Sequence, residues 1–371
     1  MSRWMRNVET ILGTAVALSI ILATPSLAAS TQIITFDNEH NVVPSFDQAV
    51  ERAKKFNVIV AKEDQYQPAT IAAMKAANPR LKLLLYTKAI RTYEAELPES
   101  YYCHNAAGER VLGTDDNGAK YLMAPTSGWA DYVTNRAITT MHDWGFTGLH
   151  IDGLAATRLL ATDSRCIAPS GLEYTSSTWV QATGALGAKI VTACGCFTTI
   201  NGVNNSVQYK ATPSSWYVVQ ASGADKGVAE GFMRRAYDTT PISLSRWRGD
   251  VEMLKARSTR LAVYPKNWTT QTFDAKEKEM MWAYASFLLA QTPGKSMFGW
   301  SSAQGFLTSF RAIWDKGLGD PLGAYYQHAA GIYRRNYTRA TVEVDMNTRT
   351  GRILPPTSRS LGRTVGAAGI R

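Results

Sequence analysis

The sequence predicts an α/β protein built as a (β/α)8 TIM barrel with a small C-terminal β-hairpin extension. Eight short runs rich in leucine or β-branched residues alternate with helix-length segments over residues 32–300. This alternation favours parallel strands joined by right-handed crossovers. A closed barrel of eight such units needs about 250 residues, which this range supplies. The hydrophobic share of 45% fits a globular core and argues against broad disorder.

Each of the eight expected strands is a short apolar run that ends in polar or aromatic residues. They are 32–39, 57–64, 82–89, 148–154, 188–195, 226–232, 259–266 and 295–300. The clearest helices between them are 45–56, 67–79, 128–144 and 275–291, the last of which is the seventh. A doubly wound open sheet is the alternative, but it predicts a glycine-rich loop after the first strand, and residues 36–44 contain no glycine.

Four segments describe the predicted domain organisation. They are a signal peptide (1–29), the catalytic barrel (30–330), a hairpin packed on the barrel (331–354) and a flexible basic tail (355–371). The hairpin is predicted because apolar and polar residues alternate on both sides of a turn at 346–351. Residues 90–127, which follow the third strand, are expected to form an extended loop with a functional role.

The N-terminal segment has the layout of a secretory signal peptide. Arg3 and Arg6 precede an apolar run over 11–23, and a small-x-small site ends at Ala28. Because the run is shorter than the ~20 residues that span a bilayer, we expect cleavage near residue 28 or 29 rather than a retained anchor. The mature protein is then secreted or periplasmic, without a stable membrane span.

The formal net charge of +10 does not indicate a nucleic-acid-binding protein. Residues 1–29 hold two arginines and one glutamate, which leaves +9 for the rest of the chain. Five positive charges follow the last acidic residue: Arg349, Arg352, Arg359, Arg363 and Arg371. The remaining body carries only about +4, so the excess charge lies in a solvated tail and no nucleic-acid partner is expected.

Four cysteines bear on disulfides and metals: Cys103, Cys166, Cys194 and Cys196. Export would make disulfides permissible. A Cys-x-Cys pair without a nearby histidine is a poor zinc site, and the chain has no Cys-x-x-Cys. One bridge is expected, with Cys103 to Cys166 as the candidate, but the sequence leaves the pairing open.

The polar residues that end the predicted strands are the candidates for chemistry, because the active site of a (β/α)8 barrel lies at those ends. They are Asp37, Glu39, Glu63, Asp64, Tyr86, Lys88, Asp152, Cys194 or Asn201, Glu230, Tyr264, Lys266 and Trp300. Carboxylates and aromatic rings dominate this set. Paired carboxylates perform glycosidic acid–base chemistry and aromatic faces stack on sugar rings, so the set favours a carbohydrate site.

Asp152 and Glu230 are the predicted catalytic residues. Each interrupts a strand of small or apolar residues and is followed directly by glycine. A buried, unpaired carboxylate costs several kcal/mol, which favours a functional role over chance. The alternatives are a turn-forming role for Asp152 and a salt bridge from Glu230 to Arg234 or Arg235.

Seven further residues are predicted to bind substrate. They are Asp37, Tyr86, Lys88, His104, His150, Tyr264 and Trp300. Tyr86, Tyr264 and Trp300 are the candidate sugar platforms, with rim packing as the alternative. His150 points to the same side of its strand as Asp152, roughly 6.5–7 Å away. The favoured interpretation of His150 is a buried, hydrogen-bonded side chain one layer deeper, with orientation of a carboxylate as a further role.

Motifs of several other enzyme classes are absent. The sequence has no G-x-S-x-G, no H-E-x-x-H, no G-x-x-x-x-G-K-[ST] and no H-x-H after the first strand. The interpretations as serine hydrolase, zinc protease, nucleotide hydrolase and metal amidohydrolase therefore lose their main support. We expect neither a metal nor a cofactor.

Several segments resemble a glycoside-hydrolase-like TIM-barrel family of bacteria (hypothetical glycosyl hydrolase). They are "YCHNAAGERVLGTDDNGAKYLMAPTSGWADYVTNRAITTMHDWGFTGLHIDGL" (102–154), "GVAEGF" (227–232), "ASFLLAQTPGKSMFGW" (285–300), "LGDPLGAYYQ" (318–327) and "GIYRRNYTRATVEVD" (331–345). The resemblance runs over residues 32–353. More distantly, the chain is similar to the endo-α-1,4-polygalactosaminidases and the α-amylase clan, which also place an aspartate at the end of strand four.

The resemblance implies a role for each predicted carboxylate. By position, Asp152 matches the nucleophile or general base, and Glu230 matches the general acid or acid/base. The chain departs from the bacterial family at Thr147, where aspartate is frequent, and from the amylase clan at His150, where arginine is usual. The acid/base also falls on strand six rather than five, so an amylase-like substrate is not implied.

The predicted function is an exported glycoside hydrolase that cleaves a polysaccharide or exopolysaccharide with two carboxylates. A separation of about 5–5.5 Å between them indicates retention of anomeric configuration, and about 6.5–9.5 Å indicates inversion. The alternative is a non-catalytic carbohydrate-binding TIM barrel of the cell envelope, whose carboxylates only hydrogen-bond hydroxyl groups. A structural envelope protein is the third class, and it predicts no cleft at the strand ends.

Overall fold

The structure, a computed structural model, describes residues 31–39, 42–115, 118–154, 166–211, 214–234, 236–303 and 306–356. The predicted signal peptide and nearly all of the predicted basic tail lie outside these ranges. In the part of the chain that the structure describes, no helix is long and apolar enough to cross a membrane.

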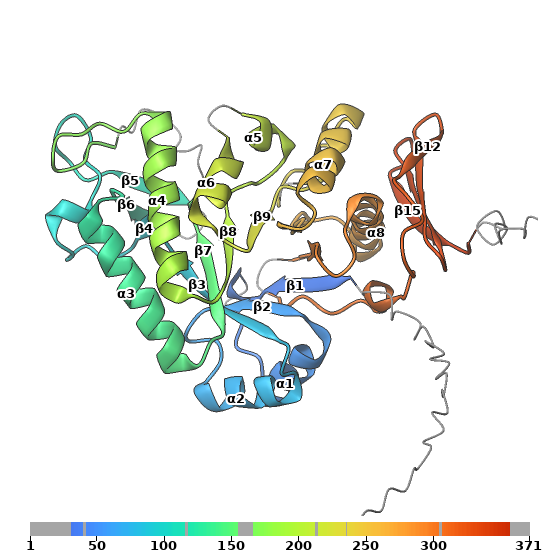
Figure 1. Cartoon of the computed structure of the whole chain (residues 1–371), viewed down its shortest axis with the longest axis horizontal. Coiled ribbons are helices and arrows are strands. Elements are labelled where there is room, and N and C mark those ends of the chain that lie inside the picture. Colours follow the sequence, from blue (N-terminus) through green and yellow to red (C-terminus); the bar gives the residue numbers. More distant parts are fainter. Residues whose placement is uncertain are drawn as a thin grey trace, which may run out of the picture.

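Eight parallel strands close into a barrel, which confirms the predicted TIM-barrel fold (Figure 1). In chain order they are β1 (Gln32–Phe36), β2 (Val58–Ala61), β3 (Lys82–Lys88), β7 (Gly148–Asp152), β8 (Phe197–Asn201), β9 (Lys226–Ala229), β10 (Leu261–Val263) and β11 (Met297–Phe298). Each strand pairs with its neighbours in this order, and β11 closes the barrel on β1. Most strand residues are buried, as expected for parallel strands covered by helices.

Helices surround the barrel (Figure 1). They are α1 (Phe46–Lys55), α2 (Pro68–Ala77), α3 (Ser127–Trp144), α4 (Ser176–Cys194), α5 (Ser206–Lys210), α6 (Ser215–Ser222), α7 (Leu244–Arg257) and α8 (Phe273–Ala290). Local sequence explains several of their ends. Ser45 and Gln48 form a capping box at the start of α1, and Gly145 takes the left-handed conformation, with φ 82°, that ends α3.

The position predicted for the fifth strand is wrong. Residues 188–195 form the end of α4 and its C-cap, and the fifth barrel strand is β8. Leu186 and Ile190 are both buried and stand four residues apart, so this apolar run is one face of a helix rather than a strand. Cys194 therefore lies on a helix, and the strand ends on Asn201.

The barrel interior holds an apolar cluster separate from the layer between strands and helices. Its members are Ile34, Phe36, Val58, Val60, Leu84, Val228, Ala262, Tyr264 and Met297. Ile33 belongs instead to the outer layer, because side chains alternate along a strand. His150 points inward as well, with its ring 5.0 Å from the ring of Phe36, between centroids.

The segment after β3 contains more regular structure than the predicted extended loop. Strands β4 (Arg91–Thr92), β5 (Leu112–Asp115) and β6 (Gly118–Leu122) form a small sheet. A disulfide joins Cys103 of this segment to Cys166 between β7 and α4, which is the pairing proposed as the candidate. This bridge ties together the loops that follow the third and fourth barrel strands. A second disulfide joins Cys194 to Cys196.

The C-terminal extension is a four-stranded antiparallel sheet, larger than the predicted hairpin. Its strands are β12 (Tyr326–Ala329), β13 (Ile332–Asn336), β14 (Thr341–Asp345) and β15 (Thr350–Leu354), paired in sequence order. The sheet packs on α8, away from α3 and α4 (Figure 1). Gly351 permits the close approach, because a Cβ there would lie 2.2 Å from the carbonyl oxygen of Met281.

Candidate active site

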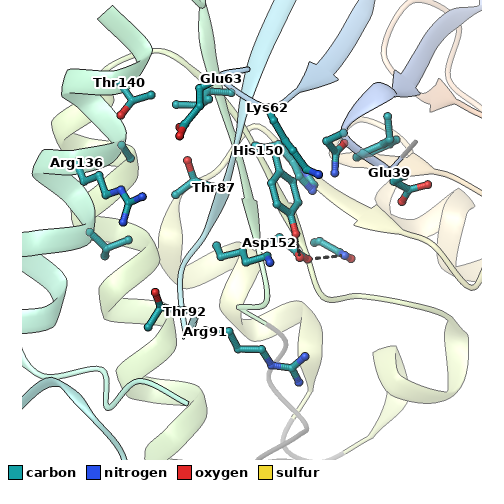
Figure 2. Close-up of a pocket in the computed structure, with 18 of the residues that line it drawn as sticks. Glu39, Lys62, Glu63, Thr87, Arg91, Thr92, Arg136, Thr140, His150 and Asp152 are labelled. Carbon is teal, nitrogen blue, oxygen red and sulfur yellow. Dashed lines mark hydrogen bonds between the residues drawn. The ribbon is translucent and has the colours of Figure 1, made fainter. Parts of the chain in front are cut away.

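A cavity of about 870 Å³ opens at the carboxyl ends of the barrel strands (Figure 2). Its polar and aromatic lining residues include Asn38, Glu39, Lys62, Glu63, Asp64, Tyr86, Lys88, Arg91, Tyr93, Glu94, Arg136, His150, Asp152, Asn201, Glu230, Lys266 and Trp268. A (β/α)8 barrel places its active site at this end. The alternative of a structural envelope protein predicts no cleft at this end of the barrel, and the structure has one.

Asp152 ends β7 and receives hydrogen bonds from two neutral side chains. The Tyr86 hydroxyl donates to Oδ2 at 2.5 Å, and the Asn201 amide donates to Oδ1 at 2.9 Å. Burial acts to raise the pKa of the Asp152 carboxyl, but His150 and these two donors more than offset it, so the pKa lies below its ordinary value. The site therefore holds an ionised carboxylate at neutral pH.

His150 lies one layer below Asp152 on the same strand and is 1% exposed. Its Nδ1 lies 2.7 Å from the hydroxyl of Thr199, and its ring stacks near Tyr86 with 5.9 Å between centroids. Burial lowers the pKa of His150 to about 4. The histidine is therefore neutral at physiological pH, where the hydrogen bonds of Tyr86 and Asn201 and the charge of Lys266 favour the ionised form of Asp152.

Glu230 follows β9 and shares one cation with a second glutamate. Lys266 Nζ lies 3.1 Å from Glu230 Oε1 and also forms an ion pair with Glu39, which follows β1. The alternative interpretation of Glu230 paired it with Arg234 or Arg235. Arg234 pairs instead with Glu279 at 2.5 Å, and Arg235 lies outside the described residues.

Glu39 is a buried carboxyl whose pKa is raised to about 7. Burial is the largest cause, and the nearby Glu230 carboxylate also raises the pKa, whereas Lys266 lowers it. The Tyr264 hydroxyl also acts to lower it, although no hydrogen bond of good geometry joins it to Glu39 within the described residues. Glu39 is therefore protonated in part of the molecules close to neutral pH.

The cavity brings together five of the nine predicted site residues. They are Tyr86, Lys88, His150, Asp152 and Glu230. Asp37 lies outside the cavity and is fully buried among other partners. It accepts hydrogen bonds from Arg52 Nε at 3.1 Å and from the Tyr66 hydroxyl at 2.5 Å. The carboxylate is thus part of an ion-pair network between β1 and α1.

Three other predicted residues also lie away from the cavity lining. Tyr264 packs inside the barrel against Phe36, with 4.3 Å between ring centroids, and Trp300 is 1% exposed. Neither ring presents an open face to the cavity. His104 lies on the loop after β3, where its Nε2 is 2.6 Å from a carboxylate oxygen of Glu99.

Several cavity residues were not predicted as site residues. Arg91, Tyr93 and Glu94 follow β3 directly, so a search of the first loop residues after each strand would find them. Trp268 stands two residues after Lys266 and would be found in the same way. Arg136 lies in the middle of α3, and no local sequence pattern marks it.

A (β/α)8 barrel whose strand ends enclose carboxylates, cations and aromatic rings in one cavity has the layout of carbohydrate-active barrels. The family follows from the sequence: residues 75–341 match Hypothetical glycosyl hydrolase family 15, and the chain belongs to this family. Asp152, Glu230 and Lys266 lie in the matched range, and Glu39 precedes it. No curated protein matches the sequence.

Solved structures of glycosidases share the fold. Alpha-N-acetylgalactosaminidase NagBb from Bifidobacterium bifidum has a TM-score of 0.51 at 12% identity, covering 88% of this chain and 58% of that one. GH36 alpha-galactosidase AgaA from Geobacillus stearothermophilus has a TM-score of 0.50 at 8% identity, and the match covers 85% of this chain and 48% of that one. The glycoside hydrolase domain of PelA from Pseudomonas aeruginosa has a TM-score of 0.48 at 12% identity, and the match covers 76% of this chain and 98% of that one. The chain thus spans about half the length of the first two enzymes, and it is a glycosyl hydrolase-like TIM-barrel protein.

Proposed function

We propose that this protein is an exported glycoside hydrolase that cleaves a polysaccharide or exopolysaccharide with Asp152 and Glu230. The observation that supports this most is the environment of Asp152. Its carboxylate lines the cavity and is held ionised by hydrogen bonds from Tyr86 and Asn201. An ionised, positioned carboxylate is what attack on an anomeric carbon, or activation of a water, requires.

Glu230 is the proposed acid. As the glycosidic C–O bond breaks, it transfers its proton to the leaving oxygen, and Asp152 supplies the electron pair or removes a proton from the attacking water. The raised pKa of Glu39 supports this role, because the carboxyl that shares Lys266 with Glu230 keeps a proton near neutral pH. Lys266 stabilises the negative charge that the proton leaves behind.

Release of reducing ends from a panel of bacterial polysaccharides tests the proposal. We expect wild type to release them from at least one preparation, and Asp152→Asn and Glu230→Gln each to lower the rate at least about a hundredfold. Asp131→Asn is the matched control, because its carboxylate is 60% exposed and pairs with Lys189 on the surface. Glycan binding without products in all four proteins would contradict the enzyme and support the carbohydrate-binding barrel.

The anomer released first decides between the two uses of Asp152. Proton NMR of fresh product would show retained configuration for a nucleophile and inverted configuration for a general base. Asp152 ends β7 and Glu230 follows β9, with β8 between these two strands.

Export is supported by the layout of residues 1–29 and by the two disulfides, which persist in oxidising compartments. Expression in a bacterial host should yield a periplasmic or secreted protein whose N-terminus, by mass spectrometry, begins just after residue 28 or 29. A protein that stays in the cell pellet with residues 1–29 still attached would contradict export. A variant with Leu18→Arg in the apolar run should stay in the cytoplasm.

A further inference from the structure

The cavity wall at the end of β1 presents two buried oxygen atoms. Asn38 is 8% exposed and the Glu39 side chain is 10% exposed, and both line the cavity. Among the described residues, neither Asn38 Oδ1 nor Glu39 Oε2 has a hydrogen-bond partner. Folded proteins rarely leave buried polar atoms unsatisfied, so these two oxygens are positioned to meet a ligand.

The charges around the two oxygens restrict the kind of ligand. Lys266 forms an ion pair with Glu39 and lies 3.1 Å from Glu230. An ammonium group brought to Glu39 would be repelled by Lys266 and a carboxylate by the two glutamates, and the existing ion pairs of Lys266 already use the opposite charge that would attract either ligand. A neutral hydroxyl group avoids both repulsions.

The protonation state of Glu39 favours the same kind of ligand. Burial raises the pKa of this carboxyl to about 7, so both of its forms are populated near neutral pH. A hydroxyl group donates to the ionised form and accepts from the protonated form, whereas an ammonium only donates and a carboxylate only accepts. Hydroxyl groups therefore satisfy Glu39 in either form.

Trp268 contributes an aromatic ring to the same cavity, beside the Lys266 that pairs with Glu39. Its ring lines the cavity and lies 5.0 Å from Lys266 Nζ. The indole N–H already donates to the Ser301 hydroxyl at 2.7 Å, so the residue contributes surface rather than a donor. Sugar rings combine an apolar C–H surface with neighbouring hydroxyl groups, and this wall offers a partner for each.

We infer that Asn38, Glu39 and Trp268 form a subsite that binds a neutral sugar unit through a pair of its hydroxyl groups. The inference rests on the proposed function, because it assumes that the cavity binds carbohydrate. Figure 2 shows Glu39 on one side of Asp152, with Arg136 and Thr140 on the other. The subsite thus lies across the cavity from α3.

Isothermal titration calorimetry with defined methyl glycosides tests the subsite. The probes are the methyl α-glycosides of galactose, glucose and mannose, each beside its 2-amino-2-deoxy form and its uronate. At least one neutral glycoside should bind about tenfold more tightly than both of its charged counterparts. Glu39→Leu and Asn38→Leu should each weaken that binding about tenfold or more, because each removes a buried acceptor. Glu39→Gln, which keeps one acceptor and the side-chain volume, should weaken it less.

Two control variants separate this subsite from general effects. Glu51→Leu makes the same chemical change in an exposed glutamate of α1, outside the cavity, and should keep the binding constant within about twofold. Tyr264→Phe removes the hydroxyl behind Glu39. An equal loss in Tyr264→Phe would mean that packing behind the wall causes the effect, and it would overturn the inference. Thermal unfolding of each variant identifies any that fail to fold, in which case Glu39→Gln decides.

Failure of the subsite and failure of the glycosidase proposal give different results. Tighter binding of an amino or uronate probe, or no binding of any neutral probe at its solubility limit, overturns the subsite. Polysaccharide cleavage with an unchanged KM in Glu39→Leu also overturns the subsite while the enzyme stands. Glu39-dependent binding of a neutral glycoside without any cleavage would support the subsite and contradict the proposal that the protein is a glycosidase.

Discussion

Asp37 and Glu39 stand two residues apart in the short 3-10 turn that follows β1, where the Asp37 side chain is fully buried and the Glu39 side chain is 10% exposed. Asp37 is enclosed by Arg52, Tyr66 and Thr35, which occupy both of its carboxylate oxygens. Glu39 faces the cavity, shares Lys266 with a catalytic candidate and keeps one oxygen without a partner among the described residues. Chain neighbours of the same charge therefore have opposite environments.

The difference shows that burial of a carboxylate does not by itself indicate function. A carboxylate whose lone pairs are all used by its own protein has little left for a ligand, whereas one with an unused oxygen at a cavity wall does. Both residues are candidates from their position at the end of the first strand, but only Asp37 was predicted to bind substrate. Hydrogen-bond satisfaction distinguishes the two, and it depends on residues far along the chain.

The largest expected effect is on stability and comes from opening the network of Asp37. Arg52→Met leaves a buried carboxylate without its cation, and we expect it to lower the free energy of unfolding by about 3–5 kcal/mol. Urea unfolding measures the loss. Lys189→Met breaks an exposed pair with Asp131 and should cost less than about 1 kcal/mol. An Arg52→Met protein as stable as wild type would mean that Asp37 is not a structural carboxylate.

The next effect compares Glu39 with His150, whose pKa values move in opposite directions. Burial raises that of Glu39 from 4.5 to about 7 and lowers that of His150 from 6.5 to about 4. Glu39 then contributes stability that is present below pH 4.5 and is lost as the pH rises through about 7. His150 contributes stability that is present above pH 6.5 and is lost as the pH falls through about 4.

Replacing either group should remove its own contribution to the pH dependence of the free energy of unfolding. Relative to wild type, Glu39→Gln should gain about 3 kcal/mol as the pH rises through this window, and His150→Gln should gain about 3 kcal/mol as the pH falls. Unfolding by urea at several pH values measures both differences. Parallel curves for the three proteins would show that neither group titrates differently in the folded and unfolded states.

The smallest expected effect concerns two tyrosines, each of which donates a hydrogen bond from its hydroxyl to an aspartate. Tyr86 donates to Asp152 and Tyr66 donates to Asp37, each at 2.5 Å. Tyr86→Phe removes a donor that lowers the pKa of Asp152, so that pKa should rise. The acidic limb of the kcat/KM profile should then move to higher pH, with about tenfold lower activity on its slope.

Tyr66→Phe is the matched control for this change. It should lower stability by about 1–2 kcal/mol and leave the pH profile in place, because Asp37 lies outside the cavity. Equal displacement of the profile in both variants would contradict the assignment of separate roles to the two aspartates. Rates of reducing-end release over a pH series give the profile.

Local patterns predicted the barrel and the position of Asp152 correctly. Alternation of strands and helices, with capping residues such as Ser45 and Gly145, is a property of short segments, and a barrel of eight units needs little else. The prediction of a strand at residues 188–195 was wrong because a run of apolar residues suits both a buried strand and the buried face of a helix. Once the barrel is predicted, a carboxylate at the end of the fourth strand must lie near its mouth.

Tertiary structure alone decided which polar residues share the cavity. The partners of Glu39 come from β9 and β10, nearly two hundred residues or more along the chain, and Arg136 reaches the cavity from within a helix. Contacts across the barrel depend on which side chains face inward and how far they reach. The sequence by itself therefore determined the fold and the position of Asp152 at the end of the fourth strand, whereas the pairing of Glu39 with Lys266 and the isolation of Asp37 followed from packing between distant segments.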